Sequence, residues 1–541
     1  MARNLRVTVQ TPLRPRGVAG AAWGGWLPLL ATGAFALLIW LPAAAATHYP
    51  GSVAFLIVFE ISFTLMLLLA APRPRSYAYT FVVVFLFLGF WLKFNLHTLL
   101  EYPYQEPVGA FDGTAASWDS ALVMASLGAL GVSLARLVQL AWHRRPQRLG
   151  SPQAIEPRQP SVPSWFATCR KAIWLATAAA VIVLNVANLV AAFYAIGVDP
   201  RVVLPAHANV VIAWLLKLGL ALWIATLVQW ELQRSGSRAA DAVLLAPVGE
   251  ALGTSISALS RGIFLFHVLP YTLVALSRRT RLLRGLGRRR VAILAAVTAV
   301  GFFLSLGAVS LLRVLQYPTA APAQNVRTIT EPRRAVPAAP ADRPRARTGA
   351  DTATSASRGD TSSERLDSRR LFFVFRELRG LVVERWNGME GVMAVSSHDR
   401  LGPDLLLEAV KENPARAQLS IYQKLANADR VYVRSQGYTF LTLPGIIAIL
   451  GYSGSPVLML VGMVLVTGIM LGLEGLIRQI LANPFVTSVA GLAMASELSQ
   501  ANFPYLLFTF FVLLTLSLSA LCVVTHGRRG HLARFRAIRP T

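Results

Sequence analysis

The residues of this chain that could do chemistry begin with a single arginine. Arg261 lies in the sequence Ala-Leu-Ser-Arg-Gly, within a segment that is otherwise apolar. A charged side chain at the centre of a membrane helix costs about 2.5–3.5 kcal/mol on insertion scales, so such residues usually face a cavity and bind a ligand. Arg261 is therefore a candidate for catalysis on an anionic group, with an ion pair to Glu250 as the alternative.

A second group of arginines lies in the largest hydrophilic insertion, between Tyr317 and Leu441. Arg376, Arg379 and Arg385 accompany an amphipathic run rich in Leu and Phe. The planar guanidinium group matches pairs of phosphate oxygens, and residues three apart share one helical face. The pattern predicts an anion-binding site, with contact to lipid head groups as the alternative.

The third group surrounds Glu390, which lies between Gly388 and Gly391. Glycine lets the backbone approach a ligand closely, and a carboxylate there could act as the general base that takes a proton from a hydroxyl group. A carboxylate at the start of a helix is the alternative. His398 and Asp399 follow closely and could serve in place of Glu390.

Two lysines lie within predicted membrane spans. Lys217 is deep in its span and could line a cavity that binds substrate. Lys93 shares a helical face with His97 near one end of its span. The simplest expectation is that Lys93 extends its ammonium group toward the membrane interface.

The chain lacks the motifs of several common enzyme classes. It has no GxxxxGKS or GxxxxGKT loop, no HExxH and no DxD-type acidic pair, and its two cysteines, Cys169 and Cys522, lie in unrelated segments. These absences argue against an ATP-driven pump, a zinc protease and a metal-dependent nucleotide-sugar transferase. We expect neither a metal ion nor a cofactor.

The composition is that of a membrane protein. Of the 541 residues, 55% are hydrophobic and only 14% are charged, and the mean hydropathy is +0.52. The apolar residues fall in blocks of about twenty, the length that crosses the hydrocarbon core. The net charge of +26 comes mostly from arginines in short loops, where they set topology. It therefore gives no reason to expect a nucleic-acid partner.

We predict an all-α polytopic membrane protein with about ten transmembrane helices, a re-entrant hairpin and one large periplasmic loop with amphipathic helices. Both termini are expected in the cytoplasm. The predicted regions are an N-terminal transmembrane region (1–313), the periplasmic loop (314–440), a C-terminal transmembrane region (441–525) and a basic tail (526–541). The predicted spans are 26–46, 51–71, 78–100, 119–142, 172–194, 208–230, 291–312, 441–477, 485–500 and 503–524.

Two segments interrupt this pattern. The two halves of 239–276 are short for full spans and contain several polar residues, which favours the re-entrant hairpin and a cavity beside it. In the large loop, residues 318–363 have the composition of a disordered linker. Residues 366–437 contain three amphipathic runs, at 367–378, 404–412 and 418–429.

Two stretches resemble a known family. After the arginine-containing loop comes TLPGIIAILGYSGSPVLMLVGMVLVTGIMLGLE, and SISALSRGIF occupies 255–264. Both are similar to segments of the Wzy-type O-antigen and oligosaccharide repeat-unit polymerases. The resemblance covers mainly 250–265 and 376–475, with loose motifs. The insert at 318–363 departs from the family pattern.

The resemblance implies a protein of the bacterial inner membrane that carries out metal-independent glycosyl transfer at the periplasmic face. Donor and acceptor glycans would both be carried on undecaprenyl pyrophosphate. Membrane lipids, a chain-length regulator and a flippase are the implied partners. The residues that match by position are Arg261, Arg385 and Arg379, which would stabilise the pyrophosphate leaving group.

Other functions remain open. An O-antigen ligase would use the same donor and similar arginines. A glycan transporter would need the cavity but no base, and it would usually show two related halves, whereas this sequence has no clear internal repeat. A structural subunit of an envelope polysaccharide system is the third alternative.

Overall fold

The computed structural model describes most of the chain. The described residues are 26–72, 75–104, 106–148, 162–196, 201–205, 208–235, 240–277, 288–316, 386–412, 420–426, 443–501 and 503–537. The predicted linker at 318–363 and the amphipathic run at 367–378 lie outside them.

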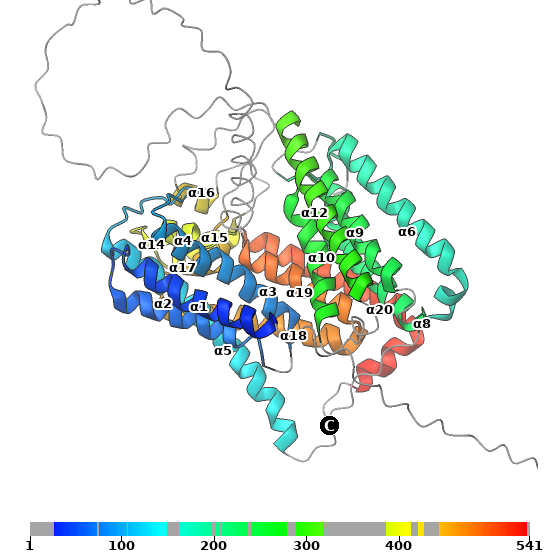
Figure 1. The fold of residues 1–541 in the computed structure, drawn as a ribbon, viewed down its shortest axis with the longest axis horizontal. Coiled ribbons are helices and arrows are strands. Elements are labelled where there is room, and N and C mark those ends of the chain that lie inside the picture. Colours follow the sequence, from blue (N-terminus) through cyan, green and yellow to red (C-terminus); the bar gives the residue numbers. More distant parts are fainter. Residues whose placement is uncertain are drawn as a thin grey trace, which may run out of the picture.

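All elements within the described ranges are helices (Figure 1). Two of them, η1 and η2, are π-helical turns. In chain order the elements are α1 (Trp26–Ala46), α2 (Val53–Leu68), α3 (Tyr77–Leu86), η1 (Phe87–Leu92), α4 (Lys93–Leu99), α5 (Ala115–Arg148), α6 (Ser164–Ala191), α7 (Ala208–Trp214), η2 (Leu215–Gly219), α8 (Leu220–Ser235), α9 (Ala240–Ser257), α10 (Arg261–Leu276), α12 (Arg288–Gln316), α14 (Met389–Ser396), α15 (Pro403–Lys411), α16 (Ile421–Leu425), α17 (Gly445–Gly451), α18 (Pro456–Leu481), α19 (Pro484–Ser499) and α20 (Pro504–Ala537).

Seven helices of the described chain are long and apolar enough to cross a membrane. This confirms the all-helical, polytopic part of the prediction. Helices α2, α10 and α19 have 16 residues and α9 has 18, fewer than the roughly 20 of a straight span. The predicted total of about ten spans therefore stays a prediction. The seven spanning segments are Tyr77–Leu99, Ala115–His143, Ser164–Ala191, Ala208–Ser235, Arg289–Arg313, Pro456–Leu481 and Pro504–His526.

Two of these segments contain a π-helical turn. The first runs through α3, η1 and α4, and the second through α7, η2 and α8. Such turns occur mostly as single wide turns inside α-helices, and frequently at functional sites. Lys93 follows η1 directly and Lys217 lies in the middle of η2, so each membrane lysine lies at a widened turn.

Helix α19 forms the centre of the bundle. It is buried along almost its whole length and packs against α3, α8 and α10. Asn483 caps its start, because its side-chain oxygen accepts hydrogen bonds from the backbone N–H groups of Phe485 and Val486 at 3.0 and 3.2 Å. Helices α6 and α12 are peripheral, with most of their surface free to contact lipid.

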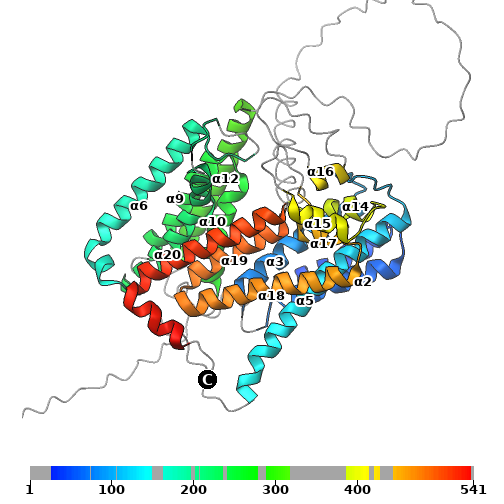
Figure 2. The same cartoon turned by 180° about the vertical axis from the view of Figure 1, so that it is seen from behind.

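Helices α14, α15, α16 and α17 gather at one end of the bundle, next to α4 (Figures 1 and 2). We call this end the loop end. It corresponds to the side that the sequence predicts to be periplasmic. The run predicted at 418–429 is helical only over Ile421–Leu425 among its described residues.

The predicted segment 441–477 consists of two helices. Helix α17 ends at Gly451, and α18 begins only at Pro456. Three local features explain the break. Gly454 has a φ of +64°, Ser455 caps α18 by accepting from Leu458 N, and Pro456 suits the first position of a helix.

The segment predicted as a hairpin consists of α9 and α10, which pack against each other. Leu259, in the turn between them, has a φ of +51°. Arg313 donates to the Leu259 carbonyl at 3.0 and 2.7 Å, and Ile196 N donates to Ala258 O at 3.0 Å. The turn is thus held by α12 and by the segment after α6. Its re-entrant character stays a prediction.

The predicted topology can be tested with fusions to a periplasmic phosphatase. The arginines of 278–290 predict a cytoplasmic location for this segment. A phosphatase fused after Gly285 is expected to be inactive, whereas one fused after Gly402 is expected to be active. Phosphatase activity from the Gly285 fusion would contradict the topology.

Candidate functional site

Lys93 and Glu390 form an ion pair that joins α4 to α14. The two side chains are only 1% and 4% exposed. Lys93 Nζ also donates to the backbone carbonyl of Trp386 at 3.2 Å. The expectation that Lys93 extends to the interface is therefore wrong. Its ammonium group turns inward because a carboxylate and a carbonyl oxygen solvate it there.

The backbone before α14 lies directly on η1. A Cβ atom on Gly89 would collide with the carbonyl oxygen of Asn387, and one on Gly388 would collide with the carbonyl of Gly89. Both glycines are needed for this close approach. Glu390 lies in the first turn of α14, where the positive end of the helix dipole also stabilises a carboxylate.

Trp386 connects this region to the hairpin. Its ring stacks on Phe85 with centroids 5.4 Å apart, and Phe85 meets Phe266 of α10 edge-on at 5.8 Å. Trp386 is the sequence neighbour of Arg385. Arg385, Arg376 and Arg379 themselves lie outside the described residues.

A second ion pair joins Lys217 of η2 to Glu497 of α19. It differs from the first in being accessible, since the side chains are 45% and 20% exposed. Lys217 nevertheless lies well inside the span Ala208–Ser235. A charged side chain at that depth needs polar or aqueous surroundings. Each charge therefore has the other as its partner within the span, and both side chains remain partly accessible.

Tyr194 lies within electrostatic range of this pair, in the segment that follows α6. Burial raises the pKa of its phenol. The charge of Lys217 lowers that pKa and the charge of Glu497 raises it. Three separate parts of the chain thus contribute polar groups to one region.

A third pair, His267 and Glu250, joins α10 to α9 and is buried, with 4% and 2% of the side chains exposed. His267 Nδ1 lies 2.8 and 3.0 Å from the two carboxylate oxygens, and its Nε2 lies 3.0 Å from the backbone carbonyl of Lys217. A carbonyl oxygen only accepts, so Nε2 carries a proton. The hydrogen bond between Nδ1 and Glu250 also needs one proton, which lies either on the imidazole or on the carboxyl group. The net charge of the His267–Glu250 pair is zero in both cases.

The His267 contact fixes the π-turn. Such a turn shifts the backbone hydrogen bonds of a helix from the fourth to the fifth residue, and His267 adds a donor to the Lys217 carbonyl within it. Thr254 donates to Glu250 at 2.9 Å. The Glu250 carboxylate is therefore shared by His267 and Thr254. The sequence had suggested Arg261 as its partner.

Arg261 is the first residue of α10 and is partly buried. The side chain of Ser260 makes no capping hydrogen bond to the first turn. Arg261 precedes His267 by six residues, which is about 9 Å along a helix axis. The structure thus places Arg261 on the same helix as the residue that contacts Lys217, nearer the turn of the hairpin.

The predicted site residues therefore fall in two places. Arg261 and Lys217 belong to the region around α10, η2 and α19. Glu390 and His398 lie at α14, which contacts that region through Trp386 and the phenylalanines. His398 is partly exposed, and its Nδ1 accepts the backbone N–H of Arg400 at 3.1 Å.

Sequence reasoning missed Glu497. It is the one charged residue of α19, and the argument that singled out Lys217 applies equally to it. Glu250 was considered as a partner of Arg261, and His267 only as one of the polar residues that interrupt the segment 239–276.

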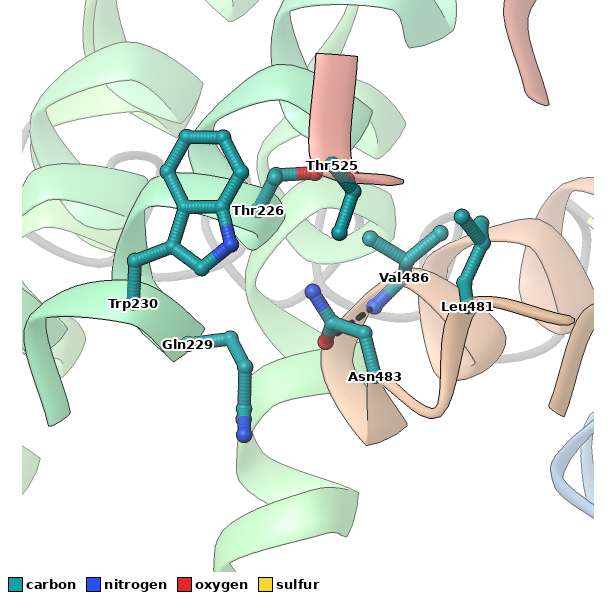
Figure 3. Close-up of a pocket in the computed structure, with 7 residues that line it drawn as sticks. All are labelled: Thr226, Gln229, Trp230, Leu481, Asn483, Val486 and Thr525. Carbon is teal, nitrogen blue, oxygen red and sulfur yellow. Dashed lines mark hydrogen bonds between the residues drawn. The ribbon is translucent and has the colours of Figure 1, made fainter. Parts of the chain in front are cut away.

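A small pocket lies elsewhere in the bundle, among α8, α19 and α20 (Figure 3). Its volume is about 10 Å³, close to the minimum for one water molecule. The dashed line in Figure 3 marks the hydrogen bond from Val486 N to Asn483. This pocket is too small for a sugar. It is lined by Thr226, Gln229, Trp230, Leu481, Asn483, Val486 and Thr525.

No protein-family model, curated protein or solved structure matches this chain.

Proposed function

We propose that this chain polymerises oligosaccharide units carried on undecaprenyl pyrophosphate, at the periplasmic face of a bacterial inner membrane. The observation that carries the proposal is the position of Arg261. It begins a 16-residue helix in the part of the bundle where an accessible ion pair, Lys217–Glu497, lies. A guanidinium group at a helix N-terminus combines a fixed charge with the positive end of the helix dipole, which suits a pyrophosphate.

In the proposed reaction an acceptor hydroxyl attacks the anomeric carbon of the donor sugar. The bond from that carbon to the lipid pyrophosphate breaks, and its electron pair passes to the pyrophosphate. Arg261 and Arg385 stabilise the charge that develops there. A carboxylate takes the proton of the acceptor hydroxyl.

Glu390 is the sequence-based candidate for that carboxylate. In the structure it is 3% exposed and paired with Lys93. Glu390 can therefore reach an acceptor only if α14 moves away from α4. Its role as the base stays a prediction, which Glu390→Gln tests.

The function is tested by the length of the surface glycan in cells that carry only a variant of this chain. Arg385→Ala is expected to abolish long chains and to leave single lipid-linked units. Arg385→Lys should restore little, because an ammonium group offers no planar fork to the phosphate oxygens. The glycans are compared on gels at equal membrane levels of each variant.

Arg400→Ala is the matched control, because Arg400 is an exposed arginine of the same loop region. It should leave the glycan ladder unchanged. A normal ladder from Arg385→Ala would contradict the assignment of this residue. Accumulation of long lipid-linked chains, in place of single units, would identify a ligase.

A further inference from the structure

We propose that Glu497 is the general base of the transfer reaction and that the Lys217–Glu497 pair receives the acceptor sugar. This inference rests on the proposed function and supplies the proton acceptor that the reaction requires. Two carboxylates, Glu390 and Glu497, each pair with a lysine at a π-helical turn.

Accessibility separates the two pairs. The Lys93 and Glu390 side chains are 1% and 4% exposed, whereas those of Lys217 and Glu497 are 45% and 20% exposed. A general base must come within hydrogen-bond reach of the proton that it takes. In this conformation Glu497 meets that condition more directly than Glu390 does.

The surroundings of Glu497 hold it in place. It lies near the end of α19, which is buried along almost its whole length, and its partner Lys217 lies on a turn whose carbonyl accepts from His267. His267 is in turn fixed by Glu250 at 2.8 Å. Catalytic groups work best on such rigid supports. Glu250 and His267 are therefore positioning residues.

The position of Glu497 also suits a donor bound at Arg261. Helix α10 carries Arg261 at its start and His267 six residues later, a separation of about 9 Å along the axis. His267 contacts the backbone of the residue that pairs with Glu497. A donor bound at Arg261 would thus lie nearer the turn of the hairpin than an acceptor bound at Lys217 and Glu497.

In the step itself, the acceptor O–H proton passes to a Glu497 carboxylate oxygen as the oxygen forms its bond to the anomeric carbon. The electrons of the broken carbon–oxygen bond remain on the lipid pyrophosphate. Glu497 then returns its proton to water. Lys217 offers its remaining N–H groups to hydroxyl oxygens of the acceptor.

The test compares Glu497→Gln with Glu390→Gln in membranes from cells that lack the wild-type chain. Glu497→Gln is expected to slow chain extension by at least about 100-fold, the usual contribution of a general base. Binding of undecaprenyl pyrophosphate to the purified variant should change by less than about twofold, because the base does not contact the leaving group. Glu497→Asp should keep part of the rate.

The dependence of rate on pH provides a second readout. Wild-type chain extension should fall as acid protonates the base, and that acid limb should disappear in Glu497→Gln. Among the described residues, Lys217 and Tyr194 lie beside Glu497, and the His267–Glu250 pair lies behind Lys217. Tyr194→Phe should leave the acid limb in place.

A charge exchange separates catalysis from structure. Each single change, Lys217→Glu or Glu497→Lys, should lower thermal stability because it places two like charges together. The double variant keeps an ion pair, so it should regain the thermal stability of the wild type but not its chain extension. Glu101→Gln is the control, because Glu101 is a 75% exposed carboxylate that pairs with His48. It should behave as wild type.

Three results would overturn the inference. They are normal extension by Glu497→Gln, recovery of extension in the charge-exchanged variant, and a loss of the acid limb in Glu390→Gln with unchanged binding of undecaprenyl pyrophosphate. Failure of the proposed function looks different. In that case the wild-type protein would not bind undecaprenyl pyrophosphate, and loss of the chain would leave the glycan ladder normal.

Discussion

Replacement of Lys93 by methionine is expected to destabilise the protein by about 3–5 kcal/mol, the usual cost of removing one partner of a buried ion pair. Lys93 and Glu390 are both almost fully buried. Without the ammonium group, the buried Glu390 carboxylate would lose its counter-charge, and the carbonyl of Trp386 would lose its donor. Thermal unfolding of the purified protein in detergent measures the loss.

The double variant Lys93→Met, Glu390→Met is the matched comparison. Two apolar side chains of similar volume can replace a buried pair with little loss, because neither charge then has to be desolvated. The double variant should therefore recover most of the stability. If Lys93→Met were as stable as wild type, the pair would not hold α14 to α4.

The helical membrane architecture could be predicted from the sequence because it depends on local properties. Apolar blocks of about twenty residues have few alternatives to a helix in lipid. The start of α18 is also local, since Ser455 and Pro456 are typical cap and first-turn residues. The start of the segment 441–477 is rich in turn residues, but that pattern alone does not place the break, which the structure puts between Gly451 and Pro456.

The pairs of Lys93 and Lys217 could not be predicted, because each joins segments that are far apart in the chain. Lys93 and its hydrogen-bond partner Trp386, just before Glu390, are separated by 293 positions, and Lys217 and Glu497 by 280. A pattern of charges in spans shows that partners must exist. It does not show which lysine meets which carboxylate, and for Lys93 the interface was the simpler expectation.

The π-turns are a further feature that periodicity does not reveal. One extra residue in a turn changes the face on which all later side chains lie. For Lys217 this decides whether the side chain meets lipid or Glu497. The packing of α8 against α19 and the contact from His267 fix that choice.

Replacement of Arg261 by alanine is expected to abolish long-chain polymer and to lower the rate of chain extension by at least about 100-fold, as the loss of one donor to a developing negative charge typically does. Single lipid-linked units should accumulate. The reason is the place of Arg261 at the start of α10, where it adds a guanidinium group to a helix N-terminus that no Ser260 side chain caps. Gel analysis of the surface glycan and of the lipid-linked pool measures both effects.

The controls for Arg261 distinguish pyrophosphate binding from support of the hairpin. Arg261→Ala should weaken binding of undecaprenyl pyrophosphate to the purified protein, whereas Glu497→Gln should not. Arg201→Ala removes an exposed arginine after α6 and should leave both binding and ladder unchanged. Arg313→Ala removes the donor to the Leu259 carbonyl, so it should lower thermal stability. If Arg261→Ala lowered stability equally and left pyrophosphate binding intact, Arg261 would act in the fold of the hairpin and not in the transfer reaction.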